Sequence, residues 1–177
     1  LVTSAHEARE ILKLIEGKDK CYGMVFNNRH LASAIRAKEL VQEGRIGRIL
    51  TFRASYLHSS ATDPDRNAGW KQNKEICGGG VLFDLGSHVI DLLHFVVGDD
   101  EQYRFDEIKS MSQIAFEKRR GMDGNEWKTN ADEAFYILAR MKNGAVGTLE
   151  ASKVAVGAND DFSIEINSDS PLSGELT

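Results

Sequence analysis

One apolar stretch limits the possible folds of this chain more than any other segment. Residues 78–99 read GGGVLFDLGSHVIDLLHFVVGD, and the predicted helix is apolar nearly all round. A helix of this composition has to be buried against another layer of the fold. Asp84, His88 and Asp91 interrupt the apolar run, so we do not expect it to span a membrane. The stretch therefore predicts the core helix of a globular domain.

The three interrupting side chains share one side of that helix, within about 60° of one another on a helical wheel. Burying an unpaired charge is costly, so this stripe must face a partner, water or a ligand. Asp84 and His88 are four residues apart, and we expect the carboxylate to contact one imidazole nitrogen. The other nitrogen would then be free as an acid or base. A core histidine with an intrahelical partner is the alternative, but Asp91 and the glycines at 78–80 favour a functional site.

Other chemistries find little support in the sequence. His88 and His94 are six residues apart, about 120° around a helix, which disfavours a shared metal ion. The chain contains no G-x-G-x-x-G dinucleotide fingerprint and no G-x-S-x-G nucleophile turn. We therefore expect no metal site and no hydrolase triad.

The remaining patterns predict an α+β fold, with an open and predominantly antiparallel sheet that carries helices on one face. Helices are expected over 3–17 and 31–44, and Leu50, Phe52, Ala54 and Tyr56 alternate as the covered face of a strand. Further strands are expected at 103–116, 133–141, 145–156 and 161–167, with a hairpin at Asn143-Gly144. Residues 21–26, CYGMVF, fit this plan poorly. They resemble a strand buried on both faces in a parallel α/β sheet.

Composition narrows the possible partners. Hydrophobic residues make up 41% of the chain, charged residues 28%, and the net charge is −5. This balance argues against a nucleic-acid or anionic membrane partner. Cys21 and Cys77 have no metal-type spacing, and the N-terminus lacks a signal-peptide pattern, so we expect a cytoplasmic location.

Four stretches in this order resemble the Gfo/Idh/MocA oxidoreductase family. The helix at 78–99 is similar to the family signature of glycines, then Asp, then His four residues on, then Asp three further. VFNNRH, AKELVQEGRIGRILTFRASY and FYILARMKNGAVGTLEASKVAVG resemble, respectively, the end of a Rossmann strand, the linker helix with the first sheet strand, and a late hairpin.

The resemblance implies the substrate half of an NAD- or NADP-dependent dehydrogenase that acts on a CH–OH group of a sugar, cyclitol or polyol. Residues 1–27 would be the last helix and strand of a truncated Rossmann domain, and 28–177 a C-terminally incomplete substrate and oligomerisation domain. The nucleotide fingerprint and the family's motif lysine are absent from the chain. We therefore expect the chain alone to be inactive, and NAD cannot be told from NADP.

The resemblance also implies roles for single residues. His88 would be the acid/base, Asp84 would orient it, and Asp91 would bind a neighbouring substrate hydroxyl. Weaker matches assign substrate contacts to Arg29, Trp70 and Lys71, and a cofactor contact to Asn27.

Each weaker match has a structural alternative. Arg29 fits a solvated linker charge equally well, and Trp70 a core plug. Tyr56 suits core packing, His58 matches no motif, and Glu150 is most simply a salt-bridge residue on the sheet.

A second function remains open from the sequence, namely a non-catalytic module that binds a sugar or oligomerises. One face of the predicted sheet has no element left to cover it. We therefore expect a homodimer or tetramer formed through the sheet.

Overall fold

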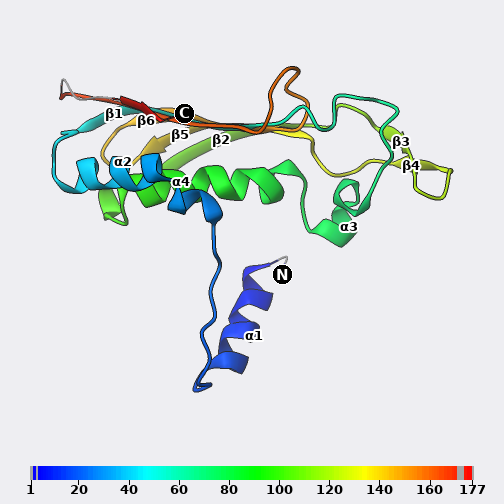
Figure 1. Cartoon of the computed structure of the whole chain (residues 1–177), viewed down its shortest axis with the longest axis horizontal. Helices are drawn as coiled ribbons and strands as arrows, with labels where there is room; N and C mark the ends of the chain where they lie inside the picture. Colours follow the sequence, from blue (N-terminus) through cyan, green and yellow to red (C-terminus); the bar gives the residue numbers. More distant parts are fainter. Residues whose placement is uncertain (1, 3, 171–173, 177) are drawn as a thin grey trace.

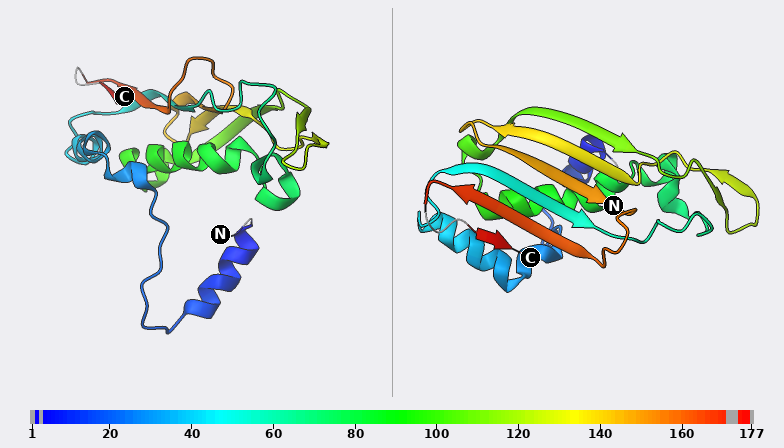
Figure 2. Two further views of the ribbon diagram at one scale, coloured as in Figure 1. Left: turned by 45° about the vertical axis from the view of Figure 1, so that its right-hand side comes forward. Right: turned by 90° about the horizontal axis from the view of Figure 1, so that it is seen from above.

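The structure is a computed structural model and describes residues 2, 4–170 and 174–176. A six-stranded sheet carries its helices on one face (Figures 1 and 2). The helical elements are α1 (Ala5–Ile15), η1 (Asn27–His30), α2 (Ala32–Gln42), η2 (Trp70–Gln72), α3 (Lys74–Cys77), the π-helix η3 (Leu82–Gly86), α4 (Ser87–Val97) and η4 (Glu101–Tyr103). The strands are β1 (Ile49–Leu57), β2 (Phe105–Gln113), β3 (Lys118–Arg120), β4 (Glu126–Lys128), β5 (Ala134–Met141), β6 (Val146–Ser152), β7 (Asp161–Ser168) and β8 (Gly174–Leu176).

The strands follow the order β2-β5-β6-β1-β7-β8, and among the neighbouring strands that the structure describes only β1 and β6 pair in parallel. This confirms the α+β fold with a predominantly antiparallel sheet. The hairpin at Asn143-Gly144 is also confirmed, because Arg140 pairs with Val146 across it. Gly144 has a φ of 89°, a left-handed conformation that glycine adopts without strain.

The core lies between the sheet and the layer formed by α2 and α4 (Figure 1). Alternation along β5 buries Phe135, Ile137 and Ala139 on this side. In β1 the buried residues are Ile49, Phe52 and Ala54, whereas Leu50 is 39% exposed. The prediction for Leu50 was wrong, since the register against β7 shifts between Ile49 and Thr51. Such an irregularity moves a side chain to the other face of a sheet.

The predicted core helix begins with a π turn rather than with regular α-helix. Asp132, in the loop before β5, accepts hydrogen bonds from the backbone N–H groups of Val81 at 2.8 Å and Leu82 at 3.1 Å. Gly80 packs so closely on Asp132 that a Cβ there would lie 2.3 Å from its carbonyl oxygen. These contacts satisfy donors that the first turn of a helix leaves unpaired.

By length and composition, the stretch Lys74–Val97 is the one described helical segment that could cross a membrane, with a mean hydropathy of 1.5. Half of it is buried inside the protein, where α4 packs on the sheet. The absence of a membrane partner stays a prediction.

Residues 21–26 are not a strand, and this part of the sequence prediction was wrong. The segment is extended and its first five residues are exposed. Figure 1 shows it leading from α1, which lies apart from the sheet, to η1. A strand needs a neighbour for its backbone hydrogen bonds, and no described strand lies beside this segment. The helix predicted before it is confirmed as α1, which buries none of its residues.

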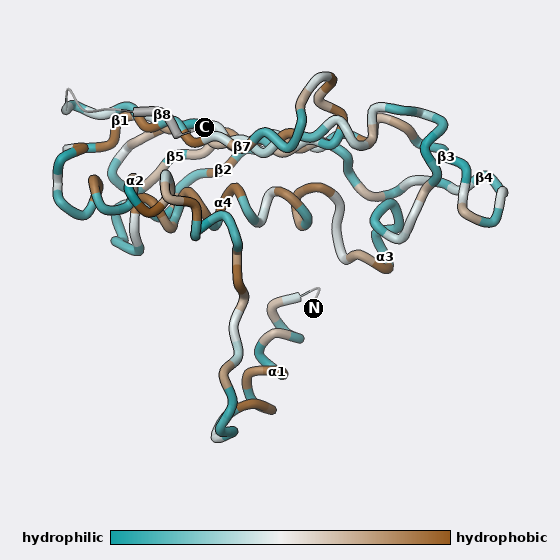
Figure 3. The backbone as a smooth tube through the Cα atoms, viewed as in Figure 1, coloured by the Kyte–Doolittle hydropathy of each residue, from teal (hydrophilic) through white to brown (hydrophobic). Residues whose placement is uncertain are grey.

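Hydrophobic residues occur along α1 and the segment after it, as the brown parts of the tube show (Figure 3). The large ones among them that are exposed have exposed fractions from 45% at Ile11 to 71% at Leu14. The small hairpin of β3 and β4 was not predicted, because strands of three residues carry too little periodicity to detect.

Candidate active site

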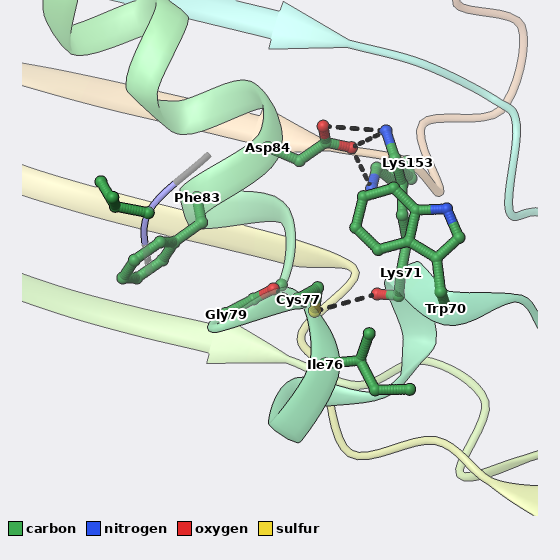
Figure 4. Close-up of a pocket in the computed structure, with 10 residues that line it drawn as sticks. Trp70, Lys71, Ile76, Cys77, Gly79, Phe83, Asp84 and Lys153 are labelled. Atoms are coloured by element: carbon green, nitrogen blue, oxygen red, sulfur yellow. Dashed lines mark hydrogen bonds and ion pairs between the residues drawn. The ribbon is translucent and has the colours of Figure 1, made fainter. Parts of the chain in front are cut away.

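Asp84 lies in the π turn with its carboxylate between two lysines (Figure 4). Lys71 Nζ from η2 lies 2.9 Å from both carboxylate oxygens, and Lys153 Nζ, just after β6, lies 2.6 Å from Oδ2. The Lys153 side chain is only 12% exposed, whereas that of Lys71 is 45% exposed. Three distant parts of the chain therefore meet at one carboxylate.

Burial of Asp84 raises its carboxyl pKa, but the hydrogen bonds from Lys153 and Lys71 outweigh this effect. The net result is a pKa below the ordinary value of 3.8. Asp84 is therefore an anion at neutral pH, and a weak base.

The sequence predicted a contact between Asp84 and His88, and the structure contradicts it. The carboxylate oxygens of Asp84 accept from the two lysine ammonium groups. His88 Nδ1 is buried and has no hydrogen-bond partner among the described residues. A carboxylate accepts a stronger hydrogen bond from an ammonium group than from a neutral imidazole N–H. The Asp84 carboxylate therefore binds the lysines rather than His88.

Aromatic rings surround His88 instead. The Phe26 ring lies 5.6 Å from the imidazole at an interplanar angle of 86°, and the Tyr56 ring lies 6.0 Å away at 85°. Both are edge-to-face arrangements, which are favourable for such pairs. Tyr56 therefore does more than pack in the core, since it forms one wall around the imidazole.

A cavity of about 260 Å³ lies beside Asp84 (Figure 4). Lys71, Lys153 and Phe83 line it together with Trp70, a residue that is 59% exposed. The alternative of Trp70 as a core plug is therefore wrong. An exposed indole beside paired ammonium groups offers an apolar platform with hydrogen-bond donors at its edge.

Arg29 and Asp91, both predicted to contact substrate, contact each other. Arg29 Nε lies 2.8 Å from Asp91 Oδ2, and Nη2 bonds to the other carboxylate oxygen. The Asp91 side chain is 11% exposed, and the Arg29 side chain 41%. This two-pronged pair ties η1 to α4, so Arg29 is not a solvated linker charge.

Some predicted residues lie outside this cluster. Asn27 is exposed at the start of η1. Glu150 forms no ion pair within the described ranges, so its reading as a salt-bridge residue was wrong, and burial raises its pKa. Among the residues that the structure describes, no group of His, Cys, Asp and Glu side chains could hold a metal ion.

Sequence reasoning missed Lys153, which no motif distinguishes from the other lysines. The one sequence feature that could have pointed to Lys153 as a site residue is its position near the end of the strand predicted at 145–156, directly after the residues that form β6. The site as a whole offers a clamped anion, two ammonium donors, an indole platform and an imidazole one turn further along.

Comparison with known proteins gives a consistent result. Residues 34–169 match the GFO/IDH/MocA C-terminal domain. The levoglucosan dehydrogenase of Pseudarthrobacter phenanthrenivorans is 29% identical over 180 residues, which covers 94% of this chain and 45% of that protein. The D-glucoside 3-dehydrogenase of Escherichia coli is 27% identical over 156 residues, covering 82% of this chain and 41% of that protein.

Solved structures give the same picture. A levoglucosan dehydrogenase in complex with NADH and L-sorbose superposes with a TM-score of 0.83 at 30% identity, over 95% of this chain and 43% of that one. The chain thus spans less than half the length of these relatives. On the family match and the shared architecture, the chain belongs to the GFO/IDH/MocA family, with residues 34–169 forming its C-terminal domain.

Proposed function

We propose that this chain is the substrate half of an NAD- or NADP-dependent dehydrogenase that oxidises a CH–OH group of a sugar, cyclitol or polyol. The observation that carries the proposal is the convergence of Lys71 and Lys153 on Asp84 beside the exposed Trp70 ring. Relatives named as sugar dehydrogenases support it.

The cavity suits a polyhydroxylated ligand. A sugar ring presents apolar C–H groups that pack on an indole, and hydroxyls that accept from ammonium groups. Asp84 holds both ammonium groups in place and adds an acceptor for a substrate hydroxyl. The cavity, at about 260 Å³, has the size expected of a site for a small ligand.

His88 is the proposed acid/base. It would take the proton of the reacting hydroxyl, while Asp84, held as an anion, would orient the substrate without removing a proton. The nicotinamide cofactor supplies the hydride acceptor when bound. Residues 1–27 are proposed to belong to the cofactor-binding domain, with Asn27 at its boundary, and 28–177 to the substrate domain. A cytoplasmic location is proposed with them.

The test uses the complete protein that contains this domain, assayed for NAD⁺ and NADP⁺ reduction with anhydrosugars, monosaccharides and polyols. His88→Ala should lower kcat by at least about 100-fold, the usual contribution of a general base, with a smaller change in KM. His30→Ala, an exposed histidine on η1, is the matched control and should retain wild-type kcat. Wild-type kcat in His88→Ala would contradict the proposed role.

The alternative of a non-catalytic sugar-binding module predicts a different result. Saturable sugar binding without reduction of either cofactor would favour that alternative. Calorimetry of the 177-residue chain with NADH provides a second check, because we expect no tight binding in the absence of a phosphate-binding turn.

A further inference from the structure

Arg119 and Glu133 form a buried ion pair that the function proposed above does not use. Their side chains are only 1% and 3% exposed, and Arg119 Nη2 lies 2.8 Å from Glu133 Oε1. Arg119 lies in β3, and Glu133 directly precedes β5. Taking two charges out of water is costly, and a buried ion pair often contributes little net stability. The pair therefore needs an explanation other than stability alone.

Both carboxylate oxygens of Glu133 accept hydrogen bonds. Oε2 accepts from the backbone N–H groups of Ala115 and Phe116, each at 3.1 Å. Oε1 accepts from Arg119 Nε at 3.2 Å as well as from Nη2. The guanidinium carbon of Arg119 also lies 4.6 Å from the centroid of the Phe116 ring. These contacts hold the guanidinium group in one orientation.

The outer donors of Arg119 bind the loop that leads from β1 toward Trp70. Nη1 donates to the carbonyl oxygen of Asp63, and Nη2 donates to that of Ala61, both at 2.7 Å. A guanidinium group presents its donors in a rigid planar fork, so one side chain fixes two carbonyl groups and a carboxylate at once. The buried pair therefore holds the start of this loop in place.

Lys153 lies between the residues that this pair connects. Its backbone N–H donates to the carbonyl oxygen of Glu133 at 2.8 Å, and its own carbonyl oxygen accepts from Ala61 N–H at 2.7 Å. With the bonds from Arg119 Nη2, these contacts close a ring through Glu133, Arg119, Ala61 and Lys153. The Lys153 side chain runs from this ring to Asp84, where its ammonium group lies 2.6 Å from Oδ2 (Figure 4).

We propose that Arg119 is a positioning residue, which holds Ala61 against the Lys153 backbone and thereby fixes the Lys153 ammonium group on Asp84. The substrate-binding part of this inference rests on the proposed function, which assigns this cluster to the substrate. The positional part concerns the geometry of the chain alone, and it can be tested without any enzymatic activity.

Two variants remove the fork of Arg119 without leaving a buried charge unpaired. Arg119→Lys keeps a cation for Glu133 but lacks the planar fork that also reaches the two carbonyl groups. Arg119→Met combined with Glu133→Gln removes both charges, and the amide oxygen can still accept from the backbone N–H groups. Arg120→Lys is the matched control, because it makes the same exchange at the exposed neighbouring residue.

The first measurement is the ¹H–¹³C spectrum of the lysine side chains in the 177-residue chain at neutral pH, with Lys153 assigned from Lys153→Met. A fixed side chain gives its two ε protons separate signals, whereas free rotation averages them into one. We expect separate signals for Lys153 in the wild type and in Arg120→Lys, and an averaged signal in Arg119→Lys and in the double variant.

Two spectral outcomes would overturn the proposal. One is an averaged Lys153 signal in the wild type, and the other is separate signals in both Arg119 variants. If Arg119→Lys fails to fold, the double variant decides. Unfolding of both variants would also overturn the proposal, because it would make the pair a general stabilising element.

The second measurement is steady-state kinetics of the complete protein. We expect Arg119→Lys to raise KM about 3- to 10-fold with a smaller change in kcat, since it weakens a hydrogen-bonding group that holds the substrate. Arg120→Lys should keep the wild-type KM. Added to Lys153→Met, Arg119→Lys should raise KM no further, because the group that it positions is gone.

An equal rise of KM with and without Lys153 would contradict positioning through this lysine. A fall in kcat at constant KM would contradict a role in holding the substrate. Inactivity of the wild type would refute the proposed function, while the spectra would still decide the positional part.

Discussion

At the scale of single residues, the choice of partner for Asp84 decides the chemistry of the site. The sequence placed Asp84 four residues before His88, and this spacing suggested a carboxylate–imidazole pair. Local spacing cannot reveal that Lys71 and Lys153 arrive from other elements, 13 and 69 residues away in the chain, because their approach depends on tertiary packing. Of the predicted residues, Lys71 does bind Asp84, Trp70 lines the same cavity, and Arg29 binds Asp91.

Removal of Lys153 tests the electrostatics of this cluster. Lys153→Met should lower the free energy of unfolding at pH 7 by about 1 kcal/mol, since it deletes one charge-assisted hydrogen bond but leaves Lys71 in place. The folded-state pKa of Asp84 lies below 3.8, so its charged form stabilises the fold above that value. This stabilisation is lost as the pH falls through the folded-state pKa.

Urea unfolding of wild type and Lys153→Met at several pH values provides the measurement. The difference between the two proteins should be largest near neutral pH and should shrink below pH 3.8. Lys109→Met, at a 75% exposed lysine of β2, serves as the control and should change stability little at any pH. A pH-independent loss in Lys153→Met would point to packing rather than charge.

At the scale of elements, strong periodic signals predicted most of the fold. The 3.6-residue stripe located α4, the two-residue alternation located β1, and Asn143-Gly144 located the hairpin that joins β5 to β6. The sequence could not give the π turn at Leu82–Gly86, which depends on hydrogen bonds to the distant Asp132. The sequence also led to a wrong prediction of a strand at residues 21–26. Apolar composition does not reveal whether a neighbouring strand is present to pair with.

The start of the core helix is sensitive to one methyl group. Gly80→Ala would place a Cβ 2.3 Å from the Asp132 carbonyl oxygen, so the backbone must shift and the hydrogen bonds to Val81 and Leu82 must stretch. We expect a loss of about 1–3 kcal/mol in unfolding free energy, as for other overpacked sites. Gly69→Ala is the control, since its added Cβ has nothing nearer than 3.7 Å. Equal melting temperatures for the two variants would contradict this prediction.

At the scale of the whole molecule, the sheet has one face without helices (Figure 2). Apolar side chains gather on it near the β2 edge, where Met111 is 74%, Leu138 50% and Tyr136 43% exposed. Met111 pairs directly with Tyr136 across the two strands, so these residues form a continuous patch. Val146 belongs to this face, whereas Ala145 is buried. We therefore keep the proposal of a two-fold assembly through the sheet.

Leu138→Asp tests this assembly. A charge at this exposed position should split an oligomer into monomers of 19.6 kDa without unfolding them. Ile137→Asp, one residue away on the covered face, should unfold the domain, because it places a carboxylate in the core. Light scattering at low micromolar concentration gives the mass, and circular dichroism gives the fold. A wild type that is monomeric throughout would contradict the proposal.

The central place of β1 also affects how the chain is made. During synthesis on a ribosome, β1 emerges long before the strands beside it. Arg53 of β1 pairs with Glu165, which lies 112 residues further along the chain, and the carbonyl group of Ile49 accepts from Asn143, which lies 94 residues further along. At about 5–20 residues per second, β1 waits roughly 6–22 s for β7 to appear. During that time the middle strand of the finished sheet is an unpaired, half-apolar segment, open to premature pairing with other chains. Synthesis speed and chaperone access should therefore govern the yield of this domain more than its final stability does.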